Sequence, residues 1–282
     1  MIRSDLHVPI VATPVEAPLA ALSDSIALAP AQLTAVPEGP YVVPAQCGRL
    51  DVSLVLPTFN ESKNIRATVH TAANILRSVP GLMFELIVVD DNSPDETWKL
   101  ALEECAAIPE LRVMRRTAES GLATAVIRGW QAATGNILAV MDADMQHPPE
   151  VLSQLVGAMQ SGADMAVGSR HVDNGGVSDW SLLRRLISRT AQGIGLLLLP
   201  NVVGRVADPM SGYFMLQRET IAGRHLNPTG YKILIEVLAR GNAETVSEVG
   251  YVFRERQEGE SKVSAQIYLQ YLQHLLRLRL GR

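Results

Sequence analysis

The sequence has few cysteines and no long apolar run. Its two cysteines, Cys47 and Cys105, are far apart in 282 residues. This argues against a disulfide framework or a cysteine-based zinc site, so we expect a reducing compartment. Every apolar stretch is shorter than the roughly 20 residues that a membrane-spanning helix needs. Any membrane contact is therefore expected to be peripheral or to occur through a partner.

An excess of positive charge is also lacking. The formal net charge is −4 at pH 7 and there is no long basic run, whereas nucleic-acid-binding domains usually present clustered Lys and Arg. We therefore expect no nucleic acid partner. The first residues have no continuous apolar core of the kind found in signal peptides. Hydrophobic residues make up 47% of the chain, which is enough for one sizeable core.

Three regions differ in composition. Residues 1–48 are rich in Pro and Ala, and the repeated prolines interrupt any helix or strand, so we predict a mostly disordered tail. Residues 49–262 have the periodic apolar pattern of one catalytic domain. Residues 263–282 combine leucines and tyrosines with arginines, which predicts an amphipathic C-terminal helix.

Short apolar runs alternate with helical patterns in the central region. The sequence predicts strands at 52–56, 84–89, 111–115, 137–141, 163–168 and 245–254, and helices at 64–78, 96–106, 122–133, 150–160, 181–199 and 231–240. This alternation is typical of parallel βαβ units with right-handed crossovers. The predicted fold class is therefore α/β, with a central, mostly parallel sheet flanked by helices.

Polar residues directly follow three of the predicted strands. They are, in chain order, Asn60 and Glu61, Asp90 and Asp91, and Asp142 and Asp144. Because the carboxyl ends of parallel strands meet at one edge of a sheet, we expect these residues to converge. Two carboxylates after a buried strand suit a hard divalent cation and the phosphates that it neutralises. Taken alone, Asp142-Ala-Asp144 could also be a solvated turn.

A set of short segments occurs in a defined order between about residues 50 and 265. They are Leu56-Pro-Thr-Phe-Asn-Glu61, Val89-Asp-Asp-Asn-Ser-Pro-Asp95, Gly121-Leu-Ala-Thr-Ala125, Ala133-Thr-Gly135, Met141-Asp-Ala-Asp-Met-Gln-His-Pro-Pro-Glu150, Gly168-Ser-Arg170, Asp208-Pro-Met-Ser-Gly-Tyr-Phe214 and Gly259-Glu-Ser-Lys262. As an ordered set they resemble the family 2 glycosyltransferases, in particular the dolichol-phosphate and polyprenyl-phosphate mannosyltransferases. The resemblance implies a GT-A, Rossmann-like fold with an amphipathic acceptor region and a C-terminal helix.

The resemblance also implies an activity. It is the transfer of mannose from GDP-mannose to a polyprenyl or dolichyl phosphate, with inversion at the anomeric carbon, at the cytoplasmic face of a membrane. The implied cofactor is Mg²⁺ or Mn²⁺, bound by Asp142, Asp144 and Gln146, whose side chains would point the same way in an extended segment. Two alternatives remain: the same chemistry with UDP-glucose or another sugar nucleotide, and a non-catalytic binding or regulatory subunit that keeps the fold.

Further site residues follow from the same resemblance. The implied donor-binding positions are Pro57, Phe59, Glu61, Asp90 or Asp91, Ala143, Arg256 and Lys262. The acceptor-phosphate positions are Arg170, Arg184 and Ser188, and Arg170 joins Asp142 and Asp144 as the expected catalytic set. A phosphate monoester has a second pKa of about 6 and is already ionised, so we expect no general base. The role of Asp208 is open between shaping the acceptor loop and contacting the sugar.

Two amphipathic segments are candidates for peripheral membrane contact. They are residues 181–199 and residues 263–280, both of which combine leucines with arginines. The first could instead be an ordinary surface helix packed on the core. The second could instead pack on the domain or on a membrane partner subunit.

Overall fold

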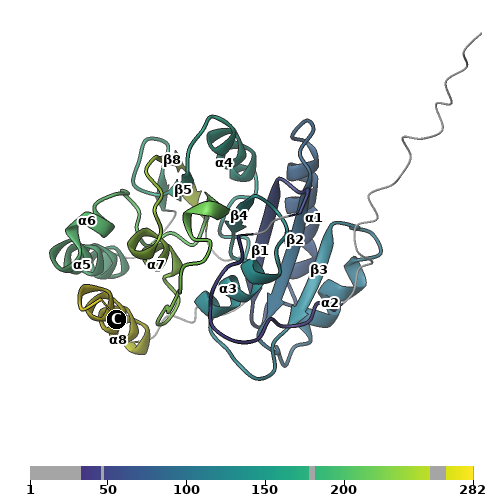
Figure 1. Cartoon of the computed structure of the whole chain (residues 1–282), viewed down its shortest axis with the longest axis horizontal. Helices are drawn as coiled ribbons and strands as arrows, with labels where there is room; N and C mark the ends of the chain where they lie inside the picture. Colours follow the sequence, from purple (N-terminus) through teal and green to yellow (C-terminus); the bar gives the residue numbers. More distant parts are fainter. Residues whose placement is uncertain (1–32, 46–47, 178–181, 255–264, 282) are drawn as a thin grey trace, which may run out of the picture.

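A computed structural model describes residues 33–45, 48–177, 182–254 and 265–281, with side chains described except at 182–189 and 265–268. Within these ranges one sheet has the strand order β3-β2-β1-β4-β7-β5-β8. Its strands are β1 (Val52–Thr58), β2 (Phe84–Asp90), β3 (Leu111–Arg115), β4 (Ile137–Val140), β5 (Met165–Ser169), β7 (Phe214–Gln217) and β8 (Val246–Gly250). Helices lie on both faces of the sheet (Figure 1). The predicted α/β class is confirmed.

The helices alternate with the strands as the sequence predicts. They are α1 (Ile65–Arg77), α2 (Thr97–Glu104), α3 (Leu122–Ala132), α4 (Val151–Gln160), α5 (Leu182–Leu198), α6 (Pro200–Val203), α7 (Ile233–Arg240) and α8 (Ala265–Arg279), with a 3₁₀ turn η1 (Arg218–Thr220). In the described part of the chain, no helix combines the length and apolarity needed to cross a bilayer.

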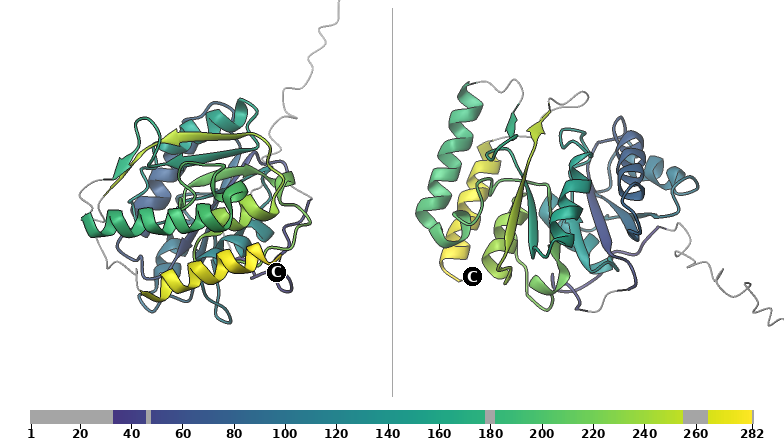
Figure 2. Two further views of the ribbon diagram at one scale, coloured as in Figure 1. Left: turned by 90° about the vertical axis from the view of Figure 1, so that its left-hand side faces the viewer. Right: turned by 90° about the horizontal axis from the view of Figure 1, so that it is seen from above.

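Side chains of β1 belong to the apolar clusters on both faces of the sheet. Leu54 and Leu56 pack with α1, α2 and α4 on one face, whereas Val55 packs with α3 and α7 on the other. The whole strand is buried, which is why it is a continuous apolar run without polar alternation. A third apolar cluster joins α5, α6 and α8 to α7, and Figure 2 shows α5 and α8 side by side.

Three strand assignments differ from the sequence prediction, and one of them is the short strand β6 (Gly176–Val177), which was not predicted. β7 was not predicted, and it runs antiparallel between β4 and β5. The predicted strand at 245–254 is two strands, because the chain leaves the main sheet after β8. Its continuation β9 (Val252–Phe253) pairs with β6 (Gly176–Val177) in a separate two-stranded sheet.

Residues 33–45 lie along the surface of the domain. Leu33 forms a bridge with Val113 of β3, Val42 forms one with His225, and Val43 is completely buried. The prolines prevent a regular ladder, yet isolated bridges and apolar contacts still fasten the segment. The prediction of a disordered tail is therefore wrong for residues 33–45, and residues 1–32 lie outside the described ranges.

A buried histidine fastens α8 to the rest of the domain. The Nδ1 atom of His274 accepts a hydrogen bond from the Thr229 amide at 3.0 Å, and its Nε2 atom lies 3.4 Å from Glu236 Oε2 on α7. Because Nδ1 is the acceptor, the neutral ring carries its proton on Nε2, facing Glu236. Burial lowers the pKa of His274, and the cations Arg240 and Arg277 act in the same direction.

Candidate active site

The connection from β3 to β4 reverses the direction in which strands are added to the sheet. β1 pairs with β2 on one side and with β4 on the other, both in parallel. Ligands of α/β proteins bind outside the carboxyl ends of strands at such a switch point. The residues that follow β1, β2 and β4 therefore lie at one edge of the sheet, as the sequence predicts. The Thr68 hydroxyl of α1 also donates to the Ala143 carbonyl at 3.1 Å, which secures the loop after β4.

The loop after β4 is bent, and the expectation of an extended segment is wrong. Met145 has a left-handed backbone conformation with φ of 60°. The Gln146 amide donates to Asp144 Oδ1 at 3.1 Å. In such a turn an aspartate accepts a hydrogen bond from the amide two residues later, which satisfies the turn locally without strand pairing. The turn, rather than strand periodicity, brings Asp144 and Gln146 together.

Asp142 is the more accessible carboxylate of this loop. Its side chain is 31% exposed, whereas Asp144 is buried at 8% exposure. Gly212 lies against it from the segment before β7, and a Cβ atom at that position would come 3.1 Å from Asp142 Oδ2. Any larger residue at position 212 would press on this carboxylate, so the motif Ser211-Gly212 has a direct steric role in the site.

Gln146 connects the loop to the segment after β9. Its side-chain amide nitrogen donates to the Arg254 carbonyl at 3.0 Å, and the Arg254 amide donates to the Gln146 carbonyl at 3.0 Å. This assignment of the amide leaves Oε1 as its acceptor atom. Asp142, Asp144 and Gln146 thus offer oxygen atoms from one short loop, a donor set that suits Mg²⁺ or Mn²⁺.

His147 is enclosed by aromatic rings. The centroid of its imidazole lies 5.2 Å from that of Tyr213, 5.6 Å from that of Tyr251 and 5.3 Å from that of Phe253. Burial lowers the pKa of His147 to about 4, so the ring is neutral near pH 7. This environment supports a structural role, in which the imidazole packs behind the Asp142 loop.

Arg170 forms a buried ion pair with Asp208. Its Nε atom donates to Asp208 Oδ2 at 2.6 Å and an Nη atom donates to Oδ1 at 2.7 Å, while the Arg170 amide also donates to Oδ2. The pair holds the pKa of Asp208 below its usual range, although burial acts in the opposite direction. Asp208 thus orients the Arg170 guanidinium at the end of β5, a contact that is neither of the two roles predicted for it from the sequence.

Lys232, which was not predicted from the sequence, lies near Arg170, Asp208 and Asp142. It precedes α7, and its ammonium donates to the Met210 carbonyl at 2.6 Å and lies 4.3 Å from the centroid of the Tyr231 ring. Burial, followed by the nearby Arg170 cation, lowers the pKa of Lys232 to about 7, while Asp208 and Asp142 oppose the shift. In the sequence, Lys232 is a lone lysine directly before an apolar helix, and this pattern is too common to identify a site residue.

Asp90, the last residue of β2, and Asp91, which follows it, have different environments. Asp90 is completely buried and accepts hydrogen bonds from Thr58 and from the amide and hydroxyl of Ser93. Asp91 lies at the rim of the site, where Arg116 Nε donates to Oδ1 and the Gly121 amide donates to Oδ2, each at 2.7 Å. Asp90 therefore secures the turn after β2, and Asp91 is the less buried of the two, with 9% of its side chain exposed.

The residues after β1 combine exposure with local hydrogen bonding. Phe59 is 44% exposed, while Glu61 is buried and accepts a hydrogen bond from the Asn64 side chain. Pro57 lies inside β1. The Thr58 carbonyl accepts a hydrogen bond from the Asp91 amide, so the backbone groups of Thr58 point toward β2. Because successive residues of a strand point to opposite sides, the Pro57 nitrogen points toward β4. It lies beyond Val55, the last residue of β1 that is paired with β4. A proline is tolerated at such a position because no ladder hydrogen bond is required of it.

The side chains of the remaining expected site residues are outside the described part of the structure. Arg184 and Ser188 belong to α5, at positions whose side chains are not described. Arg256 and Lys262 lie outside the described residues.

Comparison with known proteins identifies the family. Residues 53–221 match the family described as "Glycosyl transferase family 2". A protein of Pyrococcus furiosus named "Dolichol-phosphate mannosyltransferase" is 44% identical over 229 residues, covering 81% of this chain and 64% of that protein. The chain therefore matches less than two thirds of that relative's length. A Saccharomyces cerevisiae protein of the same name is 35% identical, covering 81% of this chain and 87% of its own.

Other similarities agree with this assignment. The "Polyprenol monophosphomannose synthase" of Mycolicibacterium smegmatis is 37% identical, covering 75% of this chain and 80% of that protein. The solved structure of glucosyl-3-phosphoglycerate synthase from Mycobacterium tuberculosis with Mn²⁺, UDP-glucose and phosphoglyceric acid has a TM-score of 0.62 at 24% identity, covering 83% of this chain and 80% of that one. At this identity the likeness concerns the GT-A fold alone. The chain belongs to glycosyl transferase family 2.

Proposed function

We propose that the protein transfers mannose from GDP-mannose to a polyprenyl or dolichyl phosphate, with inversion at the anomeric carbon. The observation that carries this proposal is the 35% identity to a relative named dolichol-phosphate mannosyltransferase, along 87% of that relative's length. The geometry is consistent with it, because carboxylates and cations lie together at the switch point. Asp142, for example, is close enough to influence the pKa values of both Arg170 and Lys232.

The donor diphosphate would be bound with a divalent cation, Mg²⁺ or Mn²⁺. Asp142, Asp144 and the Oε1 atom of Gln146 are the residues that would hold it, since they offer oxygen atoms from one loop beside the space that Gly212 keeps open. When bound, the cation stabilises the negative charge that develops on the leaving diphosphate. Structural neighbours of this fold have been solved with Mn²⁺ and with Mg²⁺.

The acceptor phosphate would be its own nucleophile. Its second pKa is about 6, so an ionised oxygen is available near neutral pH. This oxygen forms the new bond to the anomeric carbon, the bond from that carbon to the diphosphate breaks, and the nucleoside diphosphate leaves without any proton transfer. The protein must then bring two anions together, the donor diphosphate and the acceptor phosphate. Arg170 and Lys232 are suited to this task, and Asp208 keeps Arg170 charged and oriented.

Further residues complete the proposed substrate sites. Phe59, Glu61, Asp91 and Ala143 line the donor side, with Pro57 and Asp90 shaping it from behind, and Arg256 and Lys262 remain proposed donor contacts. Arg184 and Ser188 remain proposed acceptor contacts, four residues apart on one helical face of α5.

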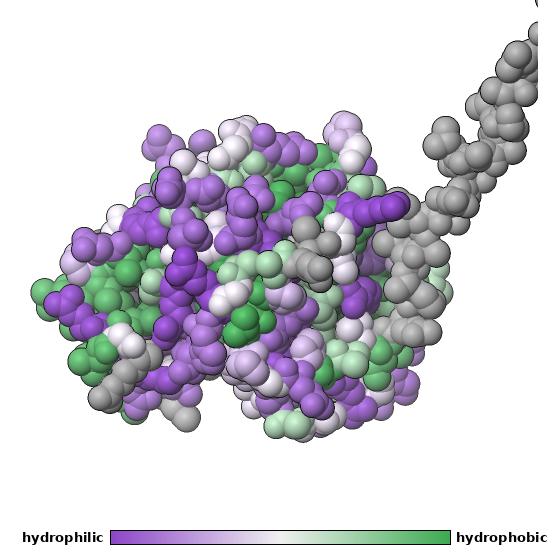
Figure 3. All heavy atoms as spheres, viewed as in Figure 1, coloured by the Kyte–Doolittle hydropathy of each residue, from purple (hydrophilic) through white to green (hydrophobic). Residues whose placement is uncertain are grey.

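The surface of α5 and α8 is the proposed site of peripheral membrane contact. Exposed leucines on these helices and at their ends are Leu196, Leu197, Leu269, Leu276 and Leu280. Figure 3 shows hydrophobic atoms gathered at the end of the molecule where Figure 1 places α5, α6 and α8. Apolar side chains beside Arg277 and Arg279 suit an anionic lipid interface. Because the cysteines predict a reducing compartment, we propose that the reaction takes place at the cytoplasmic face of the membrane. A membrane partner subunit is the alternative to lipid as the group that contacts the surface of α5 and α8.

The test is a transfer assay with a short polyprenyl phosphate and Mg²⁺, using GDP-mannose, UDP-glucose and other sugar nucleotides in parallel. Transfer from GDP-mannose alone supports the proposal, and transfer from UDP-glucose supports the second candidate. Binding of a donor without any transfer would favour a regulatory subunit. Asp144→Asn keeps the acceptor atom of the turn but removes the charge, and we expect it to lower metal-dependent transfer by about 100-fold or more. Full activity in this variant contradicts the metal assignment.

A further inference from the structure

The N-terminal strap, which we define as residues 33–45, contacts the domain beside α3, where Arg128 and Gln131 donate to the carbonyls of Gly39 and Val42. It lies outside the segment 53–221 that matches the family. The Thr34 amide donates to the Val113 carbonyl at 2.6 Å, and the Leu226 amide donates to the Tyr41 carbonyl at 2.9 Å. The strap thus joins β3 to the segment after β7, two parts of the domain that are far apart in sequence.

Tyr41 connects the strap to the loop before α3. Its hydroxyl donates to Glu119 Oε2 at 2.8 Å, and the Arg128 guanidinium lies 4.4 Å from the centroid of its ring. Arg128 also donates to Glu119 Oε1 at 2.7 Å and to the Gly39 carbonyl at 3.2 Å. Glu119 is therefore held from the strap by Tyr41 and from α3 by Arg128.

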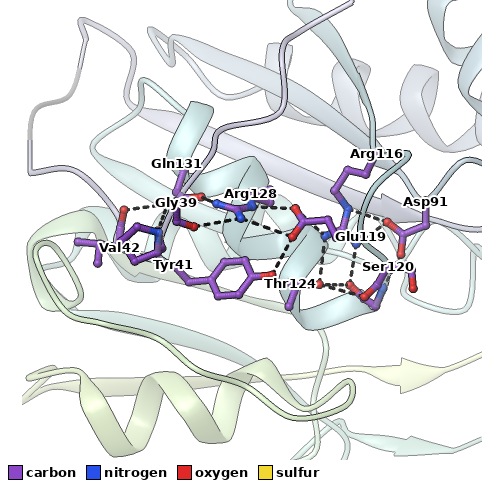
Figure 4. A network of polar contacts seen from close by, with 12 residues as sticks. Gly39, Tyr41, Val42, Asp91, Arg116, Glu119, Ser120, Thr124, Arg128 and Gln131 are labelled. Carbon is purple, nitrogen blue, oxygen red and sulfur yellow. Dashed lines mark hydrogen bonds and ion pairs between the residues drawn. The ribbon is translucent and has the colours of Figure 1, made fainter.

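The same carboxylate continues the network to the donor side of the site. An Nη atom of Arg116 lies 3.5 Å from Glu119 Oε1, and the Nε atom of Arg116 donates to Asp91 Oδ1 at 2.7 Å. The Arg116 side chain is completely buried, and it also donates to Thr124 and to the Gly121 carbonyl. Figure 4 shows the continuous series of contacts from Gly39 and Tyr41 through Glu119 and Arg116 to Asp91.

Asp91 depends on these contacts for its position and its charge. Both of its oxygens accept hydrogen bonds, one from Arg116 and one from the Gly121 amide. Burial raises the pKa of Asp91, and Arg116 is the main group that opposes this shift. A displaced Arg116 would therefore leave the carboxylate both less well oriented and less strongly favoured as an anion.

We propose that Tyr41 and Glu119 are positioning residues for the donor nucleotide, through which the N-terminal strap orients Arg116 and hence Asp91. The ligand group concerned is a hydrogen-bond donor of the nucleoside, on the base edge or the ribose, which a carboxylate accepts. This inference rests on the proposed use of a sugar nucleotide. It makes the affinity for the donor depend on Tyr41, a residue that precedes the segment 53–221 that matches the family.

The first test measures nucleotide affinity. In Tyr41→Phe the ring stays under Arg128 while the hydroxyl is lost, and in Glu119→Gln the charge is lost while the shape remains. Losing one hydrogen bond corresponds to about a 2–10-fold change in an equilibrium constant. We expect the Kd of GDP with Mg²⁺, measured by calorimetry, to rise by about this factor in each variant. In transfer assays the donor KM should rise in parallel, while kcat and the acceptor KM stay unchanged.

Two matched variants serve as controls. Tyr271→Phe removes a different tyrosine hydroxyl, which is buried and donates to the Ala191 carbonyl at 3.1 Å between α8 and α5. Glu103→Gln removes the charge of an exposed carboxylate that pairs with Arg66 on the opposite layer. Both controls should leave the Kd of GDP unchanged. If the controls weaken GDP binding as much as the strap variants, or if no strap variant weakens it, the inference is overturned.

The second test needs no ligand and separates this inference from the proposed function. Hydrogen exchange of the free protein should be faster at residues 116–121 in Tyr41→Phe and Glu119→Gln, because the Gly121 amide donates to Asp91. Exchange in α4 should not change. If wild-type protein binds neither GDP nor UDP, the proposed function fails. If the variants leave hydrogen exchange at residues 116–121 unchanged, the strap network is overturned, whatever the nucleotide result. Faster exchange with unchanged GDP affinity overturns the link to the donor.

Discussion

The substitution Asp208→Asn tests the buried ion pair on which the orientation of Arg170 depends. Asp208 is completely buried, and its two oxygens accept three hydrogen bonds from Arg170. Asparagine keeps the shape and one oxygen, but its amide group would face a guanidinium donor. Arginine cannot release its proton to relieve the loss, so a buried positive charge would remain without its partner.

The expected cost follows from this burial. Removing one partner of a buried ion pair typically lowers the free energy of unfolding by about 3–5 kcal/mol. For a domain of this size, each kcal/mol corresponds to roughly 2–4 °C in Tm, so the variant should melt roughly 6–20 °C below wild type. The pKa of Asp208 is also depressed in the folded protein. The stabilisation is thus present above the unfolded pKa of about 3.9 and is lost as the pH falls through the folded value.

A double-mutant cycle isolates the pair from other effects of the substitution. Urea unfolding at pH 7 would be measured for wild type, Asp208→Asn, Arg170→Met and the double variant. Because removing Arg170 also removes the stranded charge, the double variant should be more stable than the sum of the single losses predicts, by about 2 kcal/mol or more. Additive losses, or an Asp208→Asn variant within about 0.5 kcal/mol of wild type, would refute the reasoning.

The remaining predictions concern the two substrates and α8. Arg184→Ala should raise the KM for the lipid phosphate by about 10-fold or more, because a charge-assisted hydrogen bond is lost. An unchanged KM for the lipid phosphate, or an equal rise in the donor KM, contradicts the acceptor assignment. Arg77→Ala on the surface of α1 is the control. Lys232→Gln should raise the Kd of GDP with Mg²⁺ by a similar factor in calorimetry, and an unchanged Kd would remove Lys232 from the anion site. Because the pKa of His274 is lowered in the folded protein, the stability that the neutral ring provides is fully present above the unfolded value of about 6.5 and is lost as the pH falls below it. The free energy of unfolding should therefore fall less between pH 7.5 and pH 5.5 in His274→Gln than in wild type; parallel pH profiles would contradict this.

Local patterns in the sequence were sufficient for the βαβ half of the fold. Continuous apolar runs such as 84–89 predicted buried parallel strands, and β2 covers that range with one residue more. The convergence of Glu61, Asp91 and Asp142 followed from a general rule, because parallel strands share the direction of their carboxyl ends. The pattern of a run and the direction of its crossover are local properties, so they could be inferred without long-range contacts.

The second half of the fold depended on contacts that no local pattern specifies. β7 is a strand of four residues that fits antiparallel between β4 and β5. The prolines of residues 33–45 predicted disorder, but bridges to Val113 and His225 fasten this strap to distant parts of the domain. Backbone groups on both partners must be in place before such a bridge forms, so composition alone could not predict it.

Which chemical groups stand at the strand ends can be read from the order of the residues, whereas the role of each group depends on its neighbours in the folded chain. Asp90 and Asp91 are adjacent and chemically identical, yet the fold buries the first among turn hydrogen bonds and leaves the second at the rim. Asp208 acquires its role only because β5 places Arg170 against it, and Lys232 joins the site only because α7 begins there. Ionisation and hydrogen bonding depend on neighbours within a few ångströms, and those neighbours come from segments far apart in the chain.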